Sequence, residues 1–268
     1  MRKLINKIKR LSLHRIFILP FLFIGFTFIL ASLFANELEL KNYIADVKND
    51  KTSIAFPKLK ESLSRDWNNV VSDGSVSNMA YANSMVSEAD VRDDLIRTIN
   101  HYGNMRAWRI ADIKAVTQAL QFGNNHKDFR IDYRVVLSIM AIESEMNPYA
   151  TGYNTNGTYD YGLGQHNSCC IAERYARAIR LEREYKISTV RTATMEKYDP
   201  LTNTIATIIY LKDNRTGLES VARANRKFIP FKPFVVAYNR GFNGALYVDN
   251  SEQVQYYNRF IVAYARIN

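Results

Sequence analysis

The hydrophobic pattern divides the chain into an apolar N-terminal stretch, a polar connector and a long region with helical periodicity. Residues 16–35 are apolar except for Thr27 and Ser32. Residues 36–85 are polar and charge-rich, and their many serines, asparagines and small residues are typical of a flexible linker. Over residues 86–268 apolar positions recur at helical spacing. We therefore expect a polar connector followed by one folded domain over 86–268.

Most of this folded region predicts amphipathic helices. A capping box that starts at Ser87 marks the beginning of the first one. Residues 133–146 are apolar on nearly all sides, which predicts a central buried helix that ends before Pro148. Further helices are expected at residues 108–122, 171–185, 201–213, 233–239 and 252–267. Glycines interleaved with tyrosine and threonine over 149–165 predict a loop or short hairpin. The expected fold is mainly α with one small loop or β-hairpin insert.

The apolar N-terminal stretch is long enough to cross a membrane. About 20 residues at a rise of 1.5 Å span a hydrocarbon core of roughly 30 Å. Residues 1–15 carry six basic and no acidic side chains, which predicts a cytoplasmic N-terminus, a transmembrane helix over 16–35 and an exported body. A cleaved signal peptide is the alternative. We favour an uncleaved anchor, because cleavage after Ala35 would place Leu33 where signal sequences carry a small residue.

Composition narrows the classes of function. The net charge of +10 comes largely from the basic N-terminus, so the body is only mildly basic. A nucleic-acid-binding protein would show a basic stripe or a known module, and neither occurs, so no nucleic-acid partner is expected. We also expect no metal and no cofactor, because the sequence has no phosphate-binding glycine motif and no His-Glu-x-x-His.

Cys169 and Cys170 are the two cysteines, and they are adjacent. Their spacing suits neither a zinc site nor a Cys-x-x-Cys redox motif. We expect two semi-buried thiols at the start of a helix. A strained small disulfide ring or a bond to another chain are the alternatives.

Four short blocks carry the candidate chemistry. The first is Ala-Ile-Glu-Ser-Glu-Met-Asn-Pro, which places Glu143 near the end of the buried helix. The others, in order, are Tyr-Gly-Leu-Gly-Gln at 161–165, Tyr-Asp-Pro at 198–200 and Ala-Tyr-Asn-Arg-Gly at 237–241. In this order the blocks resemble the soluble lytic transglycosylases, goose-lysozyme-like enzymes that cleave the glycan strands of peptidoglycan. The resemblance covers roughly residues 130–245 and implies a lysozyme-like fold whose central helix presents an acid at a groove.

Glu143 is the candidate catalytic residue on physical grounds as well. On a helix it shares a face with Val136, Ile139 and Met140. Burial against apolar neighbours and a place at the C-terminal end of a helix both disfavour the carboxylate, so the pKa of Glu143 is expected to be raised. A group that donates a proton to a glycosidic oxygen must be protonated near neutral pH.

The resemblance implies a reaction with a single carboxyl group. The glutamate protonates the leaving oxygen of the MurNAc-GlcNAc β-1,4 bond and then accepts the proton of the C6 hydroxyl of the same muramic acid residue. The product is 1,6-anhydro-MurNAc, and no water is consumed. Asp160, in the glycine-rich turn, is the candidate second carboxylate. If Asp160 held a water on the far face of the sugar, the chain would be a lysozyme-type hydrolase.

The resemblance also implies substrate-binding roles for the residues that match the family's motifs. These are Ser144 after the acid, Gln165 in the glycine-rich turn, and Tyr238 and Asn239 in the Ala-Tyr-Asn block. The hydroxyl of Tyr238 is expected to point at the acid, and the hydroxyl of Ser144 to support the end of the helix. Tyr161 joins them because a flat aromatic ring packs well on a sugar face.

The chain departs from the family pattern at the glycine-rich turn. Gly164 stands where the family has methionine, and His166 and Asn167 replace an apolar continuation. We expect these changes to leave the groove floor more open. They also motivate another interpretation, a non-catalytic wall-binding subunit of a secretion, conjugation or virion entry apparatus.

The expected surroundings follow from these features. Peptidoglycan strands are the expected partner of the folded domain, and the cytoplasmic membrane is the expected partner of the N-terminal helix. The chain would then be a single-pass membrane protein with a periplasmic or otherwise extracytoplasmic catalytic domain. A larger envelope-spanning or virion assembly is a further expected partner.

Overall fold

The computed structural model describes the greater part of the expected folded domain. The described residues are 80–190, 193–226, 228–247 and 251–267. The basic segment 1–15, the expected anchor 16–35 and most of the connector lie outside them. Within the described ranges, no helix combines the length and the apolar character that a membrane span requires.

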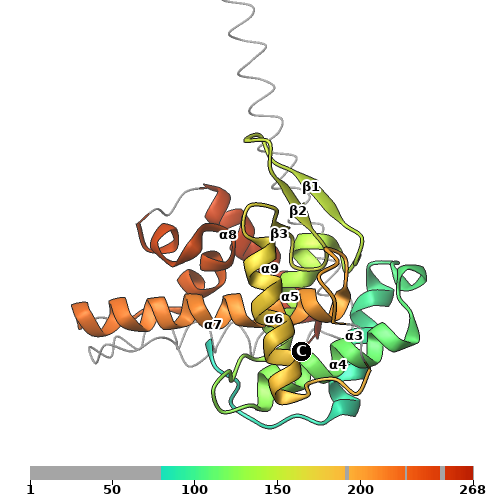
Figure 1. Ribbon diagram of the computed structural model, residues 1–268. Coiled ribbons are helices and arrows are strands. Elements are labelled where there is room, and N and C mark those ends of the chain that lie inside the picture. Colours follow the sequence, from blue (N-terminus) through green and yellow to red (C-terminus); the bar gives the residue numbers. More distant parts are fainter. Residues whose placement is uncertain (1–79, 191–192, 227, 248–250, 268) are drawn as a thin grey trace, which may run out of the picture. The chain divides into compact units, whose positions relative to one another are not determined.

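The described part of the chain is mainly helical, as predicted, with a small sheet between the helices labelled α5 and α6 (Figure 1). In chain order the elements are α3 Glu88–His101, the 3₁₀ helix η3 Met105–Ala107, α4 Ile110–Asn125, α5 Tyr133–Ser144, β1 Thr151–Tyr153, β2 Tyr159–Tyr161, β3 His166–Asn167, α6 Ile171–Tyr185, α7 Pro200–Asn225, α8 Phe231–Tyr247 and α9 Ser251–Ile267.

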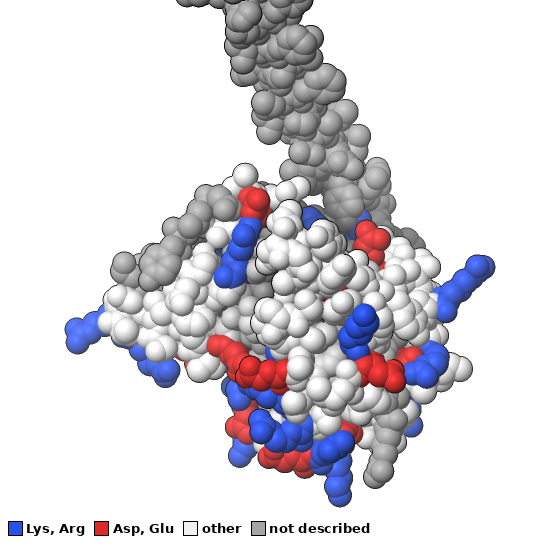
Figure 2. Space-filling model, turned by 45° about the horizontal axis from the view of Figure 1, so that its top comes forward, with Lys and Arg blue, Asp and Glu red and all other residues white. Residues whose placement is uncertain are grey.

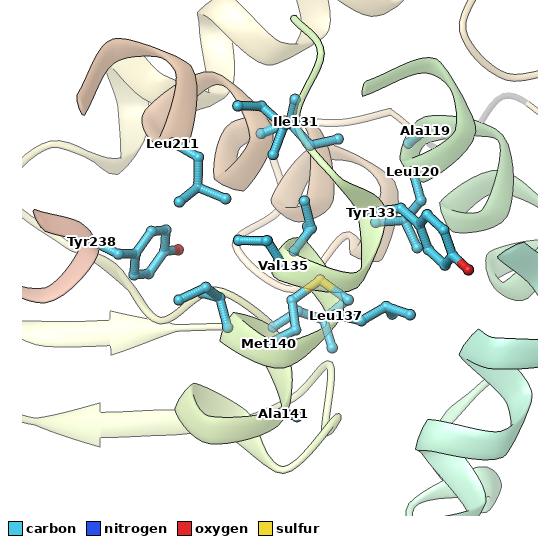
Figure 3. Close-up of a cluster of buried hydrophobic side chains, with 14 of the residues drawn as sticks. Ala119, Leu120, Ile131, Tyr133, Val135, Leu137, Met140, Ala141, Leu211 and Tyr238 are labelled. Atoms are coloured by element: carbon cyan, nitrogen blue, oxygen red, sulfur yellow. The ribbon is translucent and has the colours of Figure 1, made fainter. Parts of the chain in front are cut away.

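Helix α5 lies at the centre of the core and packs against α3, α4, α7 and α9. Its side chains are buried on nearly every side, and Val136, Leu137 and Met140 have no exposed surface. Figure 3 shows this cluster, in which residues of α5 meet Leu120 and Leu211 from other elements. The sequence therefore predicted the central helix correctly.

The end of α5 is set by the backbone rather than by the proline that follows. Glu145 and Met146 adopt left-handed conformations, with φ of 53° and 59°. The helix therefore ends at Ser144, two residues earlier than the hydrophobic pattern indicated. This turn leaves Glu143 in the last helical turn, where the chain changes direction toward the sheet.

The predicted hairpin is present and gains a third strand. Strand β1 pairs antiparallel with β2, with Gly152 opposite Asp160, and β3 pairs with the other edge of β2. Because side chains alternate along a strand, Gly152 and Asp160 belong to one face of the sheet. Tyr153, Tyr159 and Tyr161 belong to the other face.

Helix α7 is about twice as long as the hydrophobic pattern predicted. Its start is ordinary, because Asp199 caps it by accepting a hydrogen bond from the amide of Thr202 at 2.9 Å. The predicted helix ended at residue 213, and the observed second half contains Asn214 and Gly217, which are poor helix formers. Tertiary contacts stabilise the helix there, and it continues to Asn225.

The last six residues of the expected connector, 80–85, lie within the described part, and their start packs on the domain. Ala80 and Ala82 are buried. The amide of Ala82 donates to the carbonyl oxygen of Arg130 at 2.7 Å. The guanidinium of Arg215 donates to the carbonyl oxygen of Ala80 at 3.1 Å. The chain is thereby fastened to the core before α3 begins.

Candidate active site

Glu143 lies at the centre of the candidate site, in the last turn of α5. Its Oε1 accepts a hydrogen bond of 2.6 Å from the hydroxyl of Tyr256 in α9. Burial raises the pKa of Glu143 to about 7, although the Tyr256 hydrogen bond and the charge of Arg259 lower it. The charge of Asp160 raises it further. The side chain keeps some exposed surface, so it is both largely desolvated and open to a ligand.

Two residues of α9 that the sequence analysis did not assign complete the surroundings of the acid. Tyr256 is buried, and its hydroxyl donates to Glu143. Arg259, three residues later, donates to the carbonyl oxygen of Ile142. Their spacing places both on one face of α9. The three-residue spacing was the one sequence feature that could have linked Tyr256 with Arg259. Nothing local in the sequence indicates that this face of α9 contacts α5.

Tyr238, which was expected to point at the acid, is buried beside the site and makes a different hydrogen bond. Its hydroxyl donates to the carbonyl oxygen of Gly164 at 2.7 Å and lies 3.4 Å from Oγ1 of Thr207. Burial and the nearby charge of Glu143 raise the pKa of Tyr238. Tyr238 therefore connects α8 to the glycine-rich turn, and the direct contact with Glu143 comes from Tyr256.

The expectation of a more open floor at Gly164 was wrong. A Cβ atom at this position would collide with Oγ1 of Thr207 and would lie 2.5 Å from the hydroxyl oxygen of Tyr238 and 3.0 Å from Nε2 of His166. The space that a methionine would need is therefore filled by polar side chains. The substitutions at Gly164 and His166 act together, because the imidazole occupies room that the glycine leaves.

His166 belongs to the packing of this turn and carries no charge near neutral pH. It is fully buried, and burial lowers its pKa to about 3. Its Nε2 lies 3.2 Å from the carbonyl oxygen of Asn203 and 3.2 Å from Oγ1 of Thr207. The imidazole therefore ties β3 to α7.

Asp160, the candidate second carboxylate, is held by two amide groups within the sheet insert. Its Oδ1 accepts from Nδ2 of Asn167 at 2.8 Å, and its Oδ2 accepts from Nδ2 of Asn154 at 2.8 Å. Its charge contributes to the raised pKa of Glu143, so the two groups interact electrostatically. Both carboxylate oxygens are engaged with protein donors.

Two of the expected substrate-binding residues are hydrogen-bonded within the protein. The hydroxyl of Ser144 is buried and donates to the carbonyl oxygen of Met140 at 2.8 Å, which supports the end of α5. The side-chain amide of Gln165 donates to the carbonyl oxygens of Gly162 at 2.9 Å and Ala150 at 3.3 Å. Gln165 thereby holds the base of the hairpin to the turn.

The remaining two expected substrate-binding residues, Asn239 and Tyr161, belong to α8 and to the sheet. Asn239 is exposed on α8, next to Tyr238. Tyr161 extends from the face of β2 opposite to Asp160. Its ring is packed by Lys197, whose Nζ lies 4.2 Å from the ring centroid.

Among the described residues there is little support for a metal site, a redox site or a nucleic-acid-binding surface. No group of three or more histidine, cysteine, aspartate or glutamate side chains in that part of the chain is arranged to hold a metal ion. Cys169 and Cys170 are free thiols at the start of α6, as expected. Cys170 is partly buried as predicted, but Cys169 is exposed rather than semi-buried. On the face in Figure 2, basic and acidic side chains lie interspersed rather than gathered into a patch of one sign.

The comparison with protein families agrees with this geometry. A family model described as the transglycosylase SLT domain matches residues 120–260. The chain belongs to the transglycosylase SLT domain family. The match begins within α4 and extends into α9, so it includes Glu143, the sheet insert and Tyr256. Searches of curated proteins and of solved structures gave no match.

Membership in the SLT domain family supports peptidoglycan cleavage of the lytic transglycosylase type in general. The mainly helical fold with a small sheet insert fits a lysozyme-like SLT domain. Peptidoglycan is accordingly the substrate that the family implies.

Proposed function

We propose that this SLT-domain protein is a lytic transglycosylase that cleaves the MurNAc-GlcNAc β-1,4 bond and forms 1,6-anhydro-MurNAc. The observation that carries the proposal is the state of Glu143. Its raised pKa of about 7 leaves the carboxyl group able to donate a proton near neutral pH and to accept one afterwards. A single group near this pKa can serve in both steps.

In the first step the protonated Glu143 transfers its proton to the glycosidic oxygen as the bond from that oxygen to the anomeric carbon breaks. The carboxylate that results keeps the hydrogen bond from Tyr256 and the nearby charge of Arg259, which both favour the ionised form.

In the second step the C6 hydroxyl of the same sugar attacks the anomeric carbon, and Glu143 accepts the hydroxyl proton. The new bond closes the anhydro ring, and Glu143 returns to its protonated state. An internal nucleophile is favoured because it has a very high effective concentration.

The surroundings of Asp160 favour this reaction over hydrolysis by two carboxylates. A general base must be positioned on the far face of the sugar ring, where it holds the attacking water. Both oxygens of Asp160 accept hydrogen bonds from asparagine amides, which fixes the carboxylate within the sheet insert. We therefore assign the chemistry to Glu143 alone.

The non-catalytic alternative is less well supported by the site. A wall-binding subunit has no need of a desolvated carboxyl group with a dedicated tyrosine donor, and such a group costs stability when it ionises. The Glu143–Tyr256 pair is present in this chain. We further propose that the domain acts outside the cytoplasmic membrane and is anchored there by residues 16–35. Its action there within a larger envelope-spanning or virion assembly is also part of this proposal.

The products test the proposed reaction. Full-length chain is incubated with purified peptidoglycan, and the released muropeptides are weighed by mass spectrometry. We expect fragments that end in anhydro-muramic acid and are one water lighter than hydrolytic fragments. Fragments with reducing ends alone would show a lysozyme-type hydrolase, and no fragments at all would favour a wall-binding subunit.

A further inference from the structure

A row of tyrosines covers the face of the sheet opposite to Asp160. We name it the tyrosine face, and its members are Tyr149, Tyr153, Tyr159, Tyr161 and Tyr198. Tyr153 and Tyr159 are cross-strand partners in β1 and β2, and Tyr161 follows Tyr159 on the same face. Tyr198 approaches from the loop before α7, where its hydroxyl lies 2.7 Å from Oγ1 of Thr151.

The five rings form one continuous surface. Successive ring centroids lie 5.3 Å apart for Tyr153 and Tyr159, 6.1 Å for Tyr159 and Tyr161, and 5.8 Å for Tyr161 and Tyr198. Tyr149 continues the row at 6.0 Å from Tyr198. The stacked pair Tyr159 and Tyr161 is nearly parallel, with an interplanar angle of 14°. Such contacts fix the rings in place before any ligand arrives.

Three of these rings are open to solvent to an unusual degree for side chains of this size, while Tyr161 and Tyr198 are half-buried. Tyr153 is 70% exposed, Tyr149 is 56% exposed and Tyr159 is 43% exposed. The hairpin that carries two of them extends away from the helices (Figure 1). A contiguous exposed aromatic surface in a folded domain indicates a binding site more often than an accident of folding.

The tyrosine face is separate from the catalytic residues. Asp160, whose charge acts on Glu143, extends from the opposite face of β2. A ligand on the tyrosine face would therefore be separated from Asp160 by the thickness of the sheet. None of the hydrogen bonds around Glu143 involves a member of the tyrosine face.

We propose that the tyrosine face is a second binding surface for glycan strands, outside the catalytic site. The choice of glycan rests on the proposed function. Its chemistry agrees, because aromatic rings pack on the apolar faces of sugars while the tyrosine hydroxyls and Thr151 meet sugar hydroxyls.

Charge selects among glycans. The exposed Lys197 lies over the middle of the row, with its Nζ 4.2 Å from the ring centroid of Tyr161 and 5.1 Å from that of Tyr198. A cation in this position favours a strand that carries carboxylates, as the lactyl groups of muramic acid do once the stem peptides are removed. A polymer held at two surfaces dissociates more slowly than one held at the catalytic site alone.

Binding measurements with a non-cleaving chain test this surface independently of activity. The parent is full-length chain with Glu143→Gln, and the probes are purified long glycan strands stripped of stem peptides and a tetrasaccharide of the same glycan. We expect Tyr153→Ala with Tyr159→Ala to weaken binding of the long strands by at least about fivefold. The corresponding pair of phenylalanine substitutions keeps the rings and is expected to remain within about twofold of the parent.

The control is Met85→Ala, which removes a large side chain that is 74% exposed elsewhere in the domain and should leave binding unchanged. If the double alanine variant does not fold, Tyr153→Ser alone is used in its place, because Tyr153 is the most exposed ring of the tyrosine face. Long-strand binding equal to that of the parent in the folded alanine variants would overturn the proposal, as would binding that requires the stem peptides. A failure of cleavage by the wild-type chain would instead count against the proposed function.

Discussion

At the residue scale, the properties of Glu143 result from competition between burial and two partners from α9. Burial disfavours the carboxylate, while the hydroxyl of Tyr256 and the charge of Arg259 favour it. Burial is the larger effect, so the pKa of Glu143 lies at about 7 rather than at its ordinary value of 4.5. Weaker interactions with Tyr256 and Arg259 would raise the pKa of Glu143 further, so the group would stay protonated and its carboxylate would seldom be available as a base. A more polar setting would ionise it and make it a poor acid.

This pKa predicts the pH dependence of cleavage. Glu143 must start the reaction protonated, so kcat/KM is expected to fall as pH rises through about 7, approaching tenfold per pH unit well above it. The measurement is the initial rate of release of soluble muropeptides between pH 5 and 9 at low substrate concentration. A rate that increases through pH 7, or stays constant to pH 9, would contradict the assignment of Glu143 as the acid.

Tyr256→Phe tests the partner that holds the acid. The variant loses the 2.6 Å hydrogen bond to Glu143, and kcat is expected to fall about tenfold or more because hydrogen bonds to charged groups contribute roughly 1.5–3 kcal/mol. The same change removes a contact that lowers the pKa of Glu143, so the alkaline limit of the pH profile is expected to move upward.

Tyr185→Phe is the matched control for this variant, because Tyr185 lies partly exposed at the end of α6. It is expected to leave both kcat and the pH profile unchanged. A reduced kcat in Tyr256→Phe with an unmoved alkaline limit would show that Tyr256 supports packing alone.

The sequence indicated Glu143 as the candidate acid but did not indicate its direct partner, Tyr256. Glu143 stands in a motif and on an apolar helix face, and both signals are local. Tyr256 lies 113 positions later, on a helix whose own pattern says only that one face is buried. The pairing of α5 with α9 depends on the packing of the whole domain. Asp160 is a second example, because its two asparagine donors become visible only once the register of the hairpin is known.

At the element scale, helices with regular periodicity were predicted well and interrupted ones were not. Helix α6 has the bounds that its pattern predicted, residues 171–185. In α7 the predicted end at residue 213 lies before the run Asn214-Arg215-Thr216-Gly217, in which asparagine, threonine and glycine are poor helix formers. Buried contacts compensate for the low helix propensity of these residues. Asn214 donates a hydrogen bond to α8, and the missing side chain of Gly217 leaves space for the ring of Phe242.

The contact made by Asn214 can be tested against a matched position on the same helix. The side chain of Asn214 is buried and donates to the carbonyl oxygen of Ala237 at 3.0 Å. Asn214→Ala leaves that carbonyl unpaired, so the free energy of unfolding is expected to decrease by about 1–3 kcal/mol. Asn225→Ala, at the exposed end of α7, is expected to change it by less than about 0.5 kcal/mol.

Urea unfolding followed by circular dichroism measures both variants. Equal effects of the two substitutions would mean that helix propensity, rather than the bond to α8, sustains the second half of α7. The outcome also bears on the site, because Ala237 precedes Tyr238, which holds the glycine-rich turn.

At the scale of the whole molecule, the proposed N-terminal anchor bears on where the domain acts. Residues 16–35 lie outside the described residues, so the expected anchor rests on hydropathy and on the basic segment before it. We expect the full-length chain to remain with membranes after carbonate and high-salt washes. A chain that lacks residues 1–36 is the control and is expected in the soluble fraction. A soluble mature protein that begins near Asn36 would instead show a cleaved signal peptide.

The central claim, that one carboxyl group performs both proton transfers, is tested most directly by two substitutions of the same chemical kind. Glu143→Gln keeps the shape of the side chain but removes the acid, and Asp160→Asn does the same for the second carboxylate. Both full-length variants are compared with the wild-type chain by the rate of formation of anhydro-muropeptides from purified peptidoglycan at pH 6.

A stability measurement first shows that both chains are folded. In the wild type the pKa of Glu143 is about 7 when folded and 4.5 when unfolded, so ionisation of this group lowers stability as pH rises between these values. Glu143→Gln lacks this loss and is expected to be at least as stable as the wild type at pH 8. Loss of activity in this variant is then a loss of chemistry.

Glu143→Gln is expected to reduce the rate by at least about 10²–10⁴-fold, the usual contribution of general acid–base catalysis. Asp160→Asn is expected to retain activity within roughly tenfold of the wild type, because its carboxylate takes no part in the proton transfers. Activity of Glu143→Gln within a few-fold of the wild type, together with an inactive Asp160→Asn, would contradict the account.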